Sequence, residues 1–294
     1  MEYWTEISVD LSEKLSLLVD DYLKGLGSVG NVMQTLVRDE AQHLIRPCLK
    51  GYLRGSVNEN KNNIDAFKAF ISSLQEVFPE GQVGKVNVKE TSQEDWEGWK
   101  KFFKPTSVSK RVVIKPSWEQ YSPSSGEVII DIDPGMAFGT GTHETTRLCI
   151  RLLDKIIKGS EELLDIGTGS GILAIVAARL GVVKVKAIDN DESVIKIARE
   201  NIINNGVENN IEVSATPLEN LSSKFDIIVA NILAETLIDM TKEIICHINR
   251  GGSIILSGIL NSQIRKVADA YVKNGVQLEE VLGDGEWGAL LFKG

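Results

Sequence analysis

Three glycines at alternate positions form the part of this sequence best suited to holding a ligand. Gly167, Gly169 and Gly171 follow a short apolar stretch that ends at Asp165, and an apolar helical pattern begins at Ile172. This order predicts a strand, a tight turn and a helix. Glycine permits positive φ and a close approach of the backbone, and the first N–H groups of a helix lack partners within the helix. We therefore expect the turn to hold a ligand, and we place Asp165 among the residues that bind it.

A carboxylate follows the next predicted strand. The stretch VKVKAID ends at Asp189, eighteen residues after Gly171. A carboxylate at such a position accepts hydrogen bonds from both hydroxyls of an adenosine ribose. In the alternative, Asp189 caps the following helix, but Ser193 already lies near that helix start. Ribose binding is the favoured interpretation.

Two more polar segments follow predicted strands. The stretch KFDIIVANIL contains a strand that ends at Asn231, and residues 215–218 follow the strand 211–214. In an open parallel sheet the ligand lies in the crevice at the carboxyl ends of the strands. We therefore expect the glycine turn with Asp165, Asp189, residues 215–218 and Asn231 to converge on one crevice.

Residues 133–146, DPGMAFGTGTHETT, combine three glycines with four threonines directly before an amphipathic helix. Capping of that helix explains some of these residues, but not three glycines with a phenylalanine between them. We expect this loop to fold over the bound ligand. His143 lies in the loop, and we interpret it as part of the helix start in preference to a general base.

Strands and helices alternate from residue 163 onward. Strands are predicted near residues 163–164, 183–189, 211–214, 225–230, 251–260, 276–282 and 287–292, with helices at 193–204, 235–248 and 263–274. The sequence GDGE between the last two strands is a hairpin signal. The pattern predicts an α/β, Rossmann-like domain: a doubly wound sheet with a C-terminal antiparallel hairpin.

Residues 1–92 form a separate unit by their pattern. A strand near residues 4–9 is followed by a helix at 11–26, strands at 29–37 and 44–52, a helix at 64–78 and a strand at 83–88. The order βαββαβ predicts a small ferredoxin-like α+β domain. Such units bind protein or RNA, or serve in packing and dimerisation. No aromatic RNA-stacking motif of the RRM type is present.

Residues 93–110 join this unit to the second domain, residues 111–294. The stretch DWEGWKKFFKP places four aromatic side chains on one face of a short helix that ends at Pro105. We predict a helical linker that docks onto a domain, in preference to an aromatic peptide-binding patch.

The composition excludes some classes of protein. The net charge is −9, which argues against a general nucleic-acid binder but suits a basic protein partner. No apolar run is long enough to span a membrane, and the start lacks the features of a signal peptide, so we expect a cytoplasmic protein. Cys48, Cys149 and Cys246 have no metal-ligand spacing, and we expect reduced packing residues and no metal site.

Several motifs together resemble the class I S-adenosylmethionine-dependent methyltransferases, and within them the ribosomal protein L11 methyltransferase family. These motifs are DPGMAFGTGTHETT, LLDIGTGSGILAI, VANILAE, LSGIL with a later EW, and KPSWEQY upstream. The resemblance extends from about residue 111 to the C-terminus. The first ninety residues fit the family more loosely, in size, pattern and the WTEI start.

The resemblance implies that S-adenosylmethionine is the cofactor. It implies contacts from Phe138, Thr140 and Thr146 in the loop, Gly167 and Gly169 in the turn, Asp189 at the ribose and Asn231 at the methyl end. It also implies that the N-terminal domain, here residues 1–92, recognises ribosomal protein L11. The linker would let that domain present several amines.

The residues after Asn231 indicate which chemical group accepts the methyl group. Ile232, Leu233 and Ala234 stand where methyltransferases of planar amides and adenine amino groups carry NPPY or NPPF, so the aromatic clamp is missing. This favours aliphatic amines, with Asn231 as the catalytic residue that orients them. A neutral amine is required, which at pH 7 costs about 4–5 kcal/mol for lysine but only about 1 kcal/mol for an α-amine. Placement and desolvation would supply the catalysis.

Two alternatives remain at this point. Gly169, Gly171 and Ala174 also satisfy GxGxxG/A, the fingerprint of an NAD-linked oxidoreductase. A non-catalytic ribosome-assembly protein that keeps the cofactor fold is the second alternative.

Overall fold

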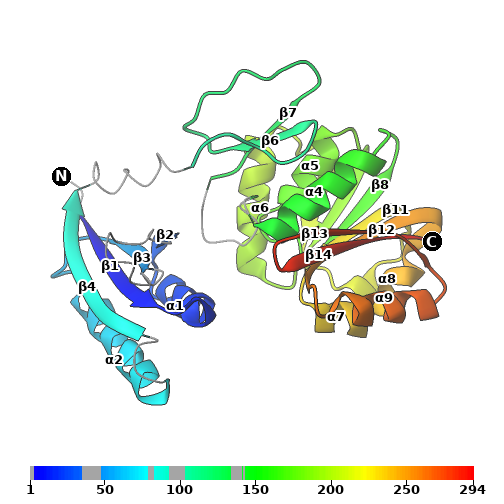
Figure 1. Cartoon of the computed structure of the whole chain (residues 1–294). Coiled ribbons are helices and arrows are strands. Elements are labelled where there is room, and N and C mark those ends of the chain that lie inside the picture. Colours follow the sequence, from blue (N-terminus) through cyan, green and yellow to red (C-terminus); the bar gives the residue numbers. More distant parts are fainter. Residues whose placement is uncertain (1–2, 35–47, 79–82, 93–102, 134–140, 142) are drawn as a thin grey trace. The chain divides into compact units, whose positions relative to one another are not determined.

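The computed structural model divides the chain into two compact units, Met1–Phe103 and Lys104–Gly294 (Figure 1). It describes residues 3–34, 48–78, 83–92, 103–133, 141 and 143–294. The expected helical linker, residues 93–110, lies mostly outside these ranges. Its described end contains the two-residue strand β5 (Thr106–Ser107), so this part is extended and not helical.

The first unit is a four-stranded sheet with two helices. In chain order its elements are β1 (Tyr3–Leu11), α1 (Glu13–Gly25), β2 (Val29–Gln34), β3 (Cys48–Arg54), α2 (Lys61–Val77) and β4 (Val83–Ser92). The strand order is β2-β3-β1-β4, and each neighbouring pair is antiparallel. The predicted order of strands and helices is therefore present, although the first residues predicted for β3 lie outside the described ranges.

One hydrophobic core joins both helices of this unit to the sheet. Alternate residues of β1, such as Ile7 and Val9, pack with the buried stripe of α2, which includes Phe67 and Ile71. Strand residues two apart and helix residues three or four apart point the same way, so each element presents one apolar face. Burial of these faces positions α1 and α2 on the same side of the sheet.

The second unit contains the larger sheet. In chain order its elements are β5, β6 (Val112–Lys115), β7 (Val128–Asp131), α4 (Glu144–Ile156), β8 (Glu162–Ile166), α5 (Ile172–Arg179), β9 (Lys184–Ile188), α6 (Glu192–Asn204), β10 (Ile211–Ser214), a 3₁₀ turn (Leu218–Asn220), β11 (Phe225–Asn231), α7 (Ala234–Asp239), α8 (Thr241–Cys246), β12 (Ile248–Leu260), α9 (Ile264–Lys273), β13 (Gln277–Asp284) and β14 (Trp287–Lys293). The predicted alternation of strands and helices is confirmed.

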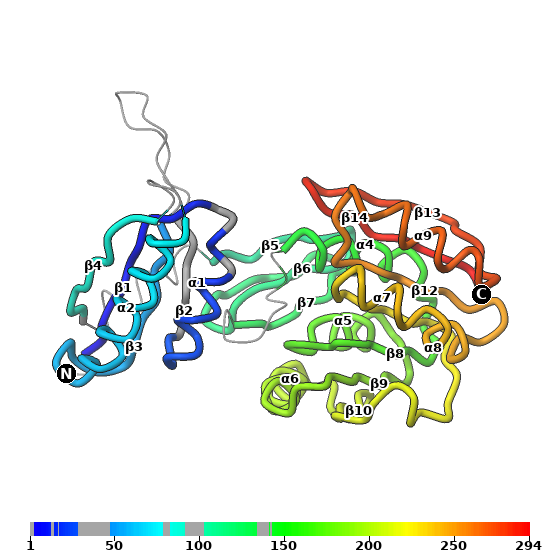
Figure 2. Tube along the Cα trace, turned by 90° about the horizontal axis from the view of Figure 1, so that it is seen from below, coloured from blue at the N-terminus to red at the C-terminus, as the bar shows by residue number. Residues whose placement is uncertain are grey.

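The seven strands of this sheet lie in the order β10-β9-β8-β11-β12-β14-β13. Figure 2 shows β10, β9 and β8 towards one edge, and β12, β13 and β14 towards the other. The first five strands are parallel, and β14 and β13 form an antiparallel hairpin at the edge. The strand order reverses at β8, because β9 and β10 are added on one side of it and β11 and β12 on the other, so the topological switch point lies at the carboxyl ends of β8 and β11. The predicted doubly wound sheet with a terminal hairpin is confirmed.

Helices cover both faces of the sheet (Figure 1). Leu163, Val229 and Ile255 face one core with α4, α5 and α6, whereas Leu164 and Ala230 face the other core with α7, α8 and α9. The parallel strands are apolar on both faces because both faces are buried. Strands β5, β6 and β7 form a small separate sheet, whose Val112 and Ile130 join the α4 core.

The predicted helix 235–248 is wrong in one respect, because the segment forms two short helices. The chain turns at Met240, between α7 and α8. The side-chain hydroxyl of Thr241 donates to the carbonyl oxygen of Ile238 at 2.7 Å. A threonine hydroxyl that bonds to a preceding carbonyl competes with the helical pattern and bends the helix.

The cysteine prediction holds for two of the three residues. Cys48 and Cys149 are buried, but Cys246 is exposed at the end of α8 and is not a packing residue. Within the described ranges, no helix is long and apolar enough to cross a membrane.

Candidate active site

The glycine turn after β8 adopts a backbone that only glycine tolerates well. Gly167, Gly169 and Gly171 have φ values of 69°, 55° and 82°. A Cβ atom on Gly167 would lie 2.4 Å from Cγ2 of Ile232. The alternating glycines are therefore required by conformation and, at the first position, also by space.

The turn is fixed by the end of the neighbouring strand. The backbone N–H groups of Gly167 and Thr168 both donate to the carbonyl oxygen of Ile188, at 2.9 and 3.0 Å. The side-chain amide of Asn201 on α6 donates to the carbonyl oxygen of Ser170 at 2.8 Å. The turn is thus held from β9 and from α6 before any ligand binds.

Asp189 lies directly beside the turn. Its Oδ2 accepts the N–H of Gly169 at 2.9 Å, and its Oδ1 accepts the N–H of Asp191 at 3.1 Å. Asp191, and not Ser193, is the N-cap of α6, because its carboxylate accepts from the N–H of Ser193. Asp189 is therefore not the helix cap, and its carboxylate remains at the carboxyl end of β9 next to the glycines.

Asp165 lies beneath the turn and is completely buried. Its Oδ2 accepts a hydrogen bond of 2.6 Å from the hydroxyl of Thr168. Its Oδ1 is buried and has no hydrogen-bond partner among the described residues. The pKa of Asp165 is raised to about 7: burial is the main cause and the charge of Asp189 adds to it, while the Thr168 hydroxyl and the Ala174 N–H act in the opposite direction.

Asn231 ends the strand next to β8. Its Nδ2 donates to the hydroxyl of Thr146, on the first turn of α4, at 3.4 Å. Its Oδ1 is buried and, like Oδ1 of Asp165, has no partner in the described part of the chain. Val229 pairs with Asp165, so Asn231, two residues further along β11, points to the same face as Asp165. The structure thus brings Asp165, Thr146 and Asn231 to one side of the switch point.

His143 is the N-cap of α4, which confirms its interpretation as a helix-start residue. Its Nδ1 accepts from the N–H of Thr145, and its ring lies 5.3 Å, centroid to centroid, from the ring of Trp287. Burial is the main cause that lowers the pKa of His143, which favours the neutral form of the imidazole. The ring is therefore occupied in joining α4 to the hairpin.

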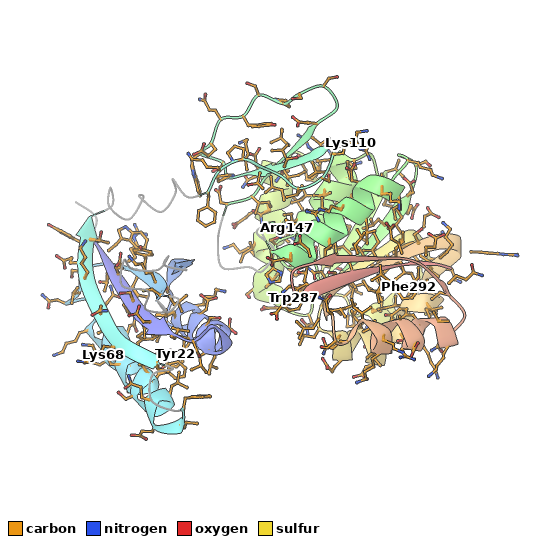
Figure 3. All side chains as sticks on the ribbon, viewed as in Figure 1. Tyr22, Lys68, Lys110, Arg147, Trp287 and Phe292 are labelled. Atoms are coloured by element: carbon orange, nitrogen blue, oxygen red, sulfur yellow. The ribbon has the colours of Figure 1, made fainter. Side chains whose placement is uncertain are left out.

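An ion pair also fixes α4 to the hairpin. Nη2 of Arg147 lies 2.9 Å from Oδ2 of Asp284, the last residue of β13. Figure 3 shows Arg147 on α4 and Trp287 on β14 at the same end of the sheet. The helix that carries Thr146 is thus held at a fixed position relative to the strands.

The expected cofactor loop is described only at its return end. Phe138 and Thr140 lie outside the described residues. Gly141 is buried with φ of 83°, and a Cβ atom there would lie 2.3 Å from Cδ1 of Ile114 and 2.9 Å from Cδ1 of Ile172. Because Ile172 begins α5, the loop returns to the chain beside the glycine turn.

A second glycine contact at this edge was not predicted as part of the site. Gly258 has φ of 82°, and a Cβ atom there would lie 2.3 Å from the carbonyl oxygen of Ile232. Ile232 therefore lies against Gly167 and Gly258, which fixes the chain directly after Asn231. The sequence did contain a signal for this contact, because a glycine inside an apolar strand segment such as LSGIL marks a bulge or a close approach of another backbone segment.

These residues fit a ligand with hydrogen-bond donors and positive charge. Two buried acceptor oxygens, on Asp165 and Asn231, have no partner among described residues, and a buried polar atom without a partner is costly. S-adenosylmethionine carries an ammonium and a sulfonium group, so its charge suits this edge. Within the described ranges, no group of acidic, histidine or cysteine side chains is placed to hold a metal ion.

The strand order with its terminal hairpin, and the glycine turn at the switch point, define a class I S-adenosylmethionine-dependent methyltransferase domain. A family model described as ribosomal protein L11 methyltransferase (PrmA) matches residues 3–294. The chain belongs to the ribosomal protein L11 methyltransferase family. It is accordingly a protein methyltransferase whose cofactor is S-adenosylmethionine.

Individual relatives agree with this assignment. A ribosomal protein L11 methyltransferase of Ruminiclostridium cellulolyticum is 38% identical over 310 residues, which cover 99% of this chain and 98% of the relative. One from Geobacter metallireducens is 36% identical over 296 residues, with the same coverage. The crystal structure of a ribosomal protein L11 methylase from Lactobacillus delbrueckii subsp. bulgaricus is 37% identical with a TM-score of 0.61, and the match covers 65% of this chain and 98% of that chain.

Proposed function

We propose that this enzyme transfers methyl groups from S-adenosylmethionine to the N-terminal α-amine and lysine side chains of ribosomal protein L11. The relatives carry this substrate in their names, and the chain covers nearly their whole length. The observation that carries the proposal is the buried Oδ1 of Asn231, an acceptor without a partner in the described part of the chain. It lies at the switch point and suits an N–H group of the acceptor amine.

The cofactor is assigned to the glycine turn. Backbone groups of Gly167 and Gly169 face its methionine part, and Asp189 accepts the ribose hydroxyls. Each oxygen of Asp189 accepts a single backbone N–H, so each keeps capacity for a further hydrogen bond. Thr146 supports this arrangement through Asn231, and Phe138 and Thr140 contact the cofactor from the preceding loop.

Asp165 is assigned a supporting position beneath the cofactor. Its side chain is completely buried and bonds to Thr168 inside the turn. Because it is buried, Asp165 would act on the cofactor indirectly: it would hold the shape of the glycine turn and supply negative charge beneath the bound cation.

Asn231 orients the acceptor amine in this proposal. The cofactor supplies an electrophilic methyl group, and the amine lone pair forms the new N–C bond while the C–S bond breaks. An amide oxygen that accepts one amine N–H leaves the lone pair directed at the methyl group. His143 is occupied as a helix cap, so positioning and exclusion of water contribute more than a general base.

The first unit is assigned to substrate recognition. The strand order β2-β3-β1-β4 and the order of elements βαββαβ support a ferredoxin-like assignment. We place this domain at residues 1–92, the linker at 93–110 and the cofactor-binding domain at 111–294. The net charge of −9 favours a basic protein partner over direct nucleic-acid contact, and a ribosomal substrate supports a cytoplasmic location.

Mass spectrometry of purified ribosomal protein L11, incubated with the enzyme and S-adenosylmethionine, tests this function. We expect mass increases of 14 Da or its multiples (one methyl group replacing one hydrogen), with the α-amine modified first because its deprotonation costs less. Cofactor binding without any methylated product would favour the non-catalytic alternative. Calorimetry that shows binding of NADH but not of S-adenosylmethionine would favour the oxidoreductase alternative.

A further inference from the structure

Asp165 has an environment that is unusual for a carboxylate. The side chain is 0% exposed, and the donors beside it are the hydroxyl of Thr168, 2.6 Å from Oδ2, and the backbone N–H of Ala174. Oδ1 has no partner among the described residues. A charged carboxylate with two neutral donors and no solvent is poorly stabilised, because burial in a medium of low dielectric constant disfavours the charged form.

Among the described residues, the groups that act on Asp165 supply no positive charge. Asp189, after β9, adds negative charge, and the Cys149 thiol on α4 stays protonated because burial raises its pKa. Ser257 on β12 and Asn231 on β11 are neutral. The basic residue of this part of α4, Arg147, lies against Asp284 of the hairpin. A cationic ligand at the turn would therefore be the compensating charge.

We propose that Asp165 is a positioning residue that carries a proton while the cofactor site is empty and releases it when the cationic cofactor binds. The inference rests on the proposed placement of the cofactor over the glycine turn. In its charged form the carboxylate offers both oxygens as acceptors, and its charge is balanced by the net positive charge of S-adenosylmethionine. Binding and deprotonation then favour each other.

The direction of the pH dependence follows from this linkage. The proton must leave for binding, so the cofactor affinity rises as pH rises towards the pKa of the empty site and levels off above it. With that pKa at about 7, the dissociation constant falls by about eightfold from pH 6 to pH 7.5. At pH 7 about half a proton per bound cofactor is released, because about half of the empty sites are protonated.

Isothermal titration calorimetry of the full-length enzyme with S-adenosylmethionine, in two buffers of different ionisation enthalpy, measures this proton release directly. Asp165→Asn removes the titrating group but keeps Asp189 and His143, so the difference from wild type isolates Asp165. We expect the affinity of the variant for S-adenosylmethionine to lack the change of about eightfold between pH 6 and pH 7.5. At pH 7 the variant should release about half a proton less per bound cofactor than wild type. Equal proton release by both proteins would overturn the inference.

Two further variants keep the test decisive. Thr168→Val removes the donor to Oδ2 and is expected to move the midpoint of the affinity profile to higher pH, because the charged form loses its hydroxyl partner. An unmoved midpoint would contradict the inference even if Asp165→Asn does not fold. Asp269 is an exposed residue of α9, and Asp269→Asn makes the same chemical substitution as Asp165→Asn away from the site. This control variant should bind S-adenosylmethionine as wild type does. Failure of wild type to bind S-adenosylmethionine would instead contradict the placement of the cofactor itself.

Discussion

Asn231 at the end of β11 donates through Nδ2 to the hydroxyl of Thr146 on α4, at 3.4 Å. The bond joins the switch point of the sheet to the first turn of the helix that follows the cofactor loop. It leaves Oδ1 of Asn231 as a buried acceptor without a partner in the described part of the chain. One amide thus connects the two segments that the sequence placed 85 residues apart.

Asn231→Ala should reduce the rate of methyl transfer by about 10- to 100-fold. The variant loses the hydrogen bond to the amine, which becomes charged as it reacts, and a hydrogen bond to a charged group contributes about 1.5–3 kcal/mol. Single-turnover transfer to ribosomal protein L11 measures this effect. Asn274→Ala, an exposed asparagine that ends α9, is the matched control and should leave transfer unchanged. A rate for Asn231→Ala equal to wild type would remove its role in orienting the amine.

Asp189→Ala should weaken the binding of S-adenosylmethionine by about 1–3 kcal/mol if the bond to the ribose is charge-assisted. The carboxylate also accepts the N–H of Gly169, so part of the loss reflects a less ordered turn. Binding of S-adenosylmethionine and of methionine, which lacks the ribose, separates the two effects by calorimetry. Unchanged affinity for S-adenosylmethionine would refute the assignment to the ribose.

Gly167→Ala should destabilise the second unit by more than Gly206→Ala. Both glycines have similar positive φ, 69° and 64°, which costs about 1 kcal/mol or more for alanine. Only Gly167 would also place Cβ against Ile232, whereas Gly206 has open space. Chemical denaturation of the two variants measures the difference, and equal losses of unfolding free energy would show that Ile232 moves away without cost.

The ion pair between Arg147 and Asp284 should contribute more to stability than the pair between Lys155 and Glu280. Both pairs join α4 to β13, but Arg147 and Asp284 are about one quarter exposed, whereas the Lys155 side chain is 60% exposed. Double-mutant cycles should give a coupling near 1 kcal/mol for the first pair and a few tenths for the second. Raising the salt concentration should weaken the exposed pair more, and the reverse order of couplings would contradict this expectation.

The stability of the cofactor-free enzyme should depend on pH through Asp165. Its folded-state pKa is raised to about 7, above the unfolded value near 3.9, so the folded state binds more protons between these values. The contribution of Asp165 is therefore favourable at low pH and is lost as pH rises from about 4 to 7, by up to about 4 kcal/mol. Comparing unfolding free energies of wild type and Asp165→Asn across this range tests the sign, and a difference that does not change with pH would contradict it.

The sequence by itself was sufficient for the pattern of local elements in the second unit. Alternating glycines after an apolar strand predicted the turn at Gly167, and the buried strands and amphipathic helices predicted a doubly wound sheet with a hairpin. These signals are local, because backbone conformation and the period of apolar residues leave their mark on neighbouring positions. The split at Met240 was missed because it depends on one hydroxyl of Thr241 that turns back onto the helix.

Only the tertiary structure decided how the polar residues of the site are paired. Asp165 was predicted as a ligand-binding residue at the turn, but its complete burial depends on the helices on this face of the sheet, where Leu163 of the same strand packs in one core with α4 and α5. The bond from Asn231 to Thr146 and the contact of Ile232 with both Gly167 and Gly258 join residues far apart in the chain. Sequence periodicity shows which face of an element is buried, whereas the partner across that face is set by three-dimensional packing.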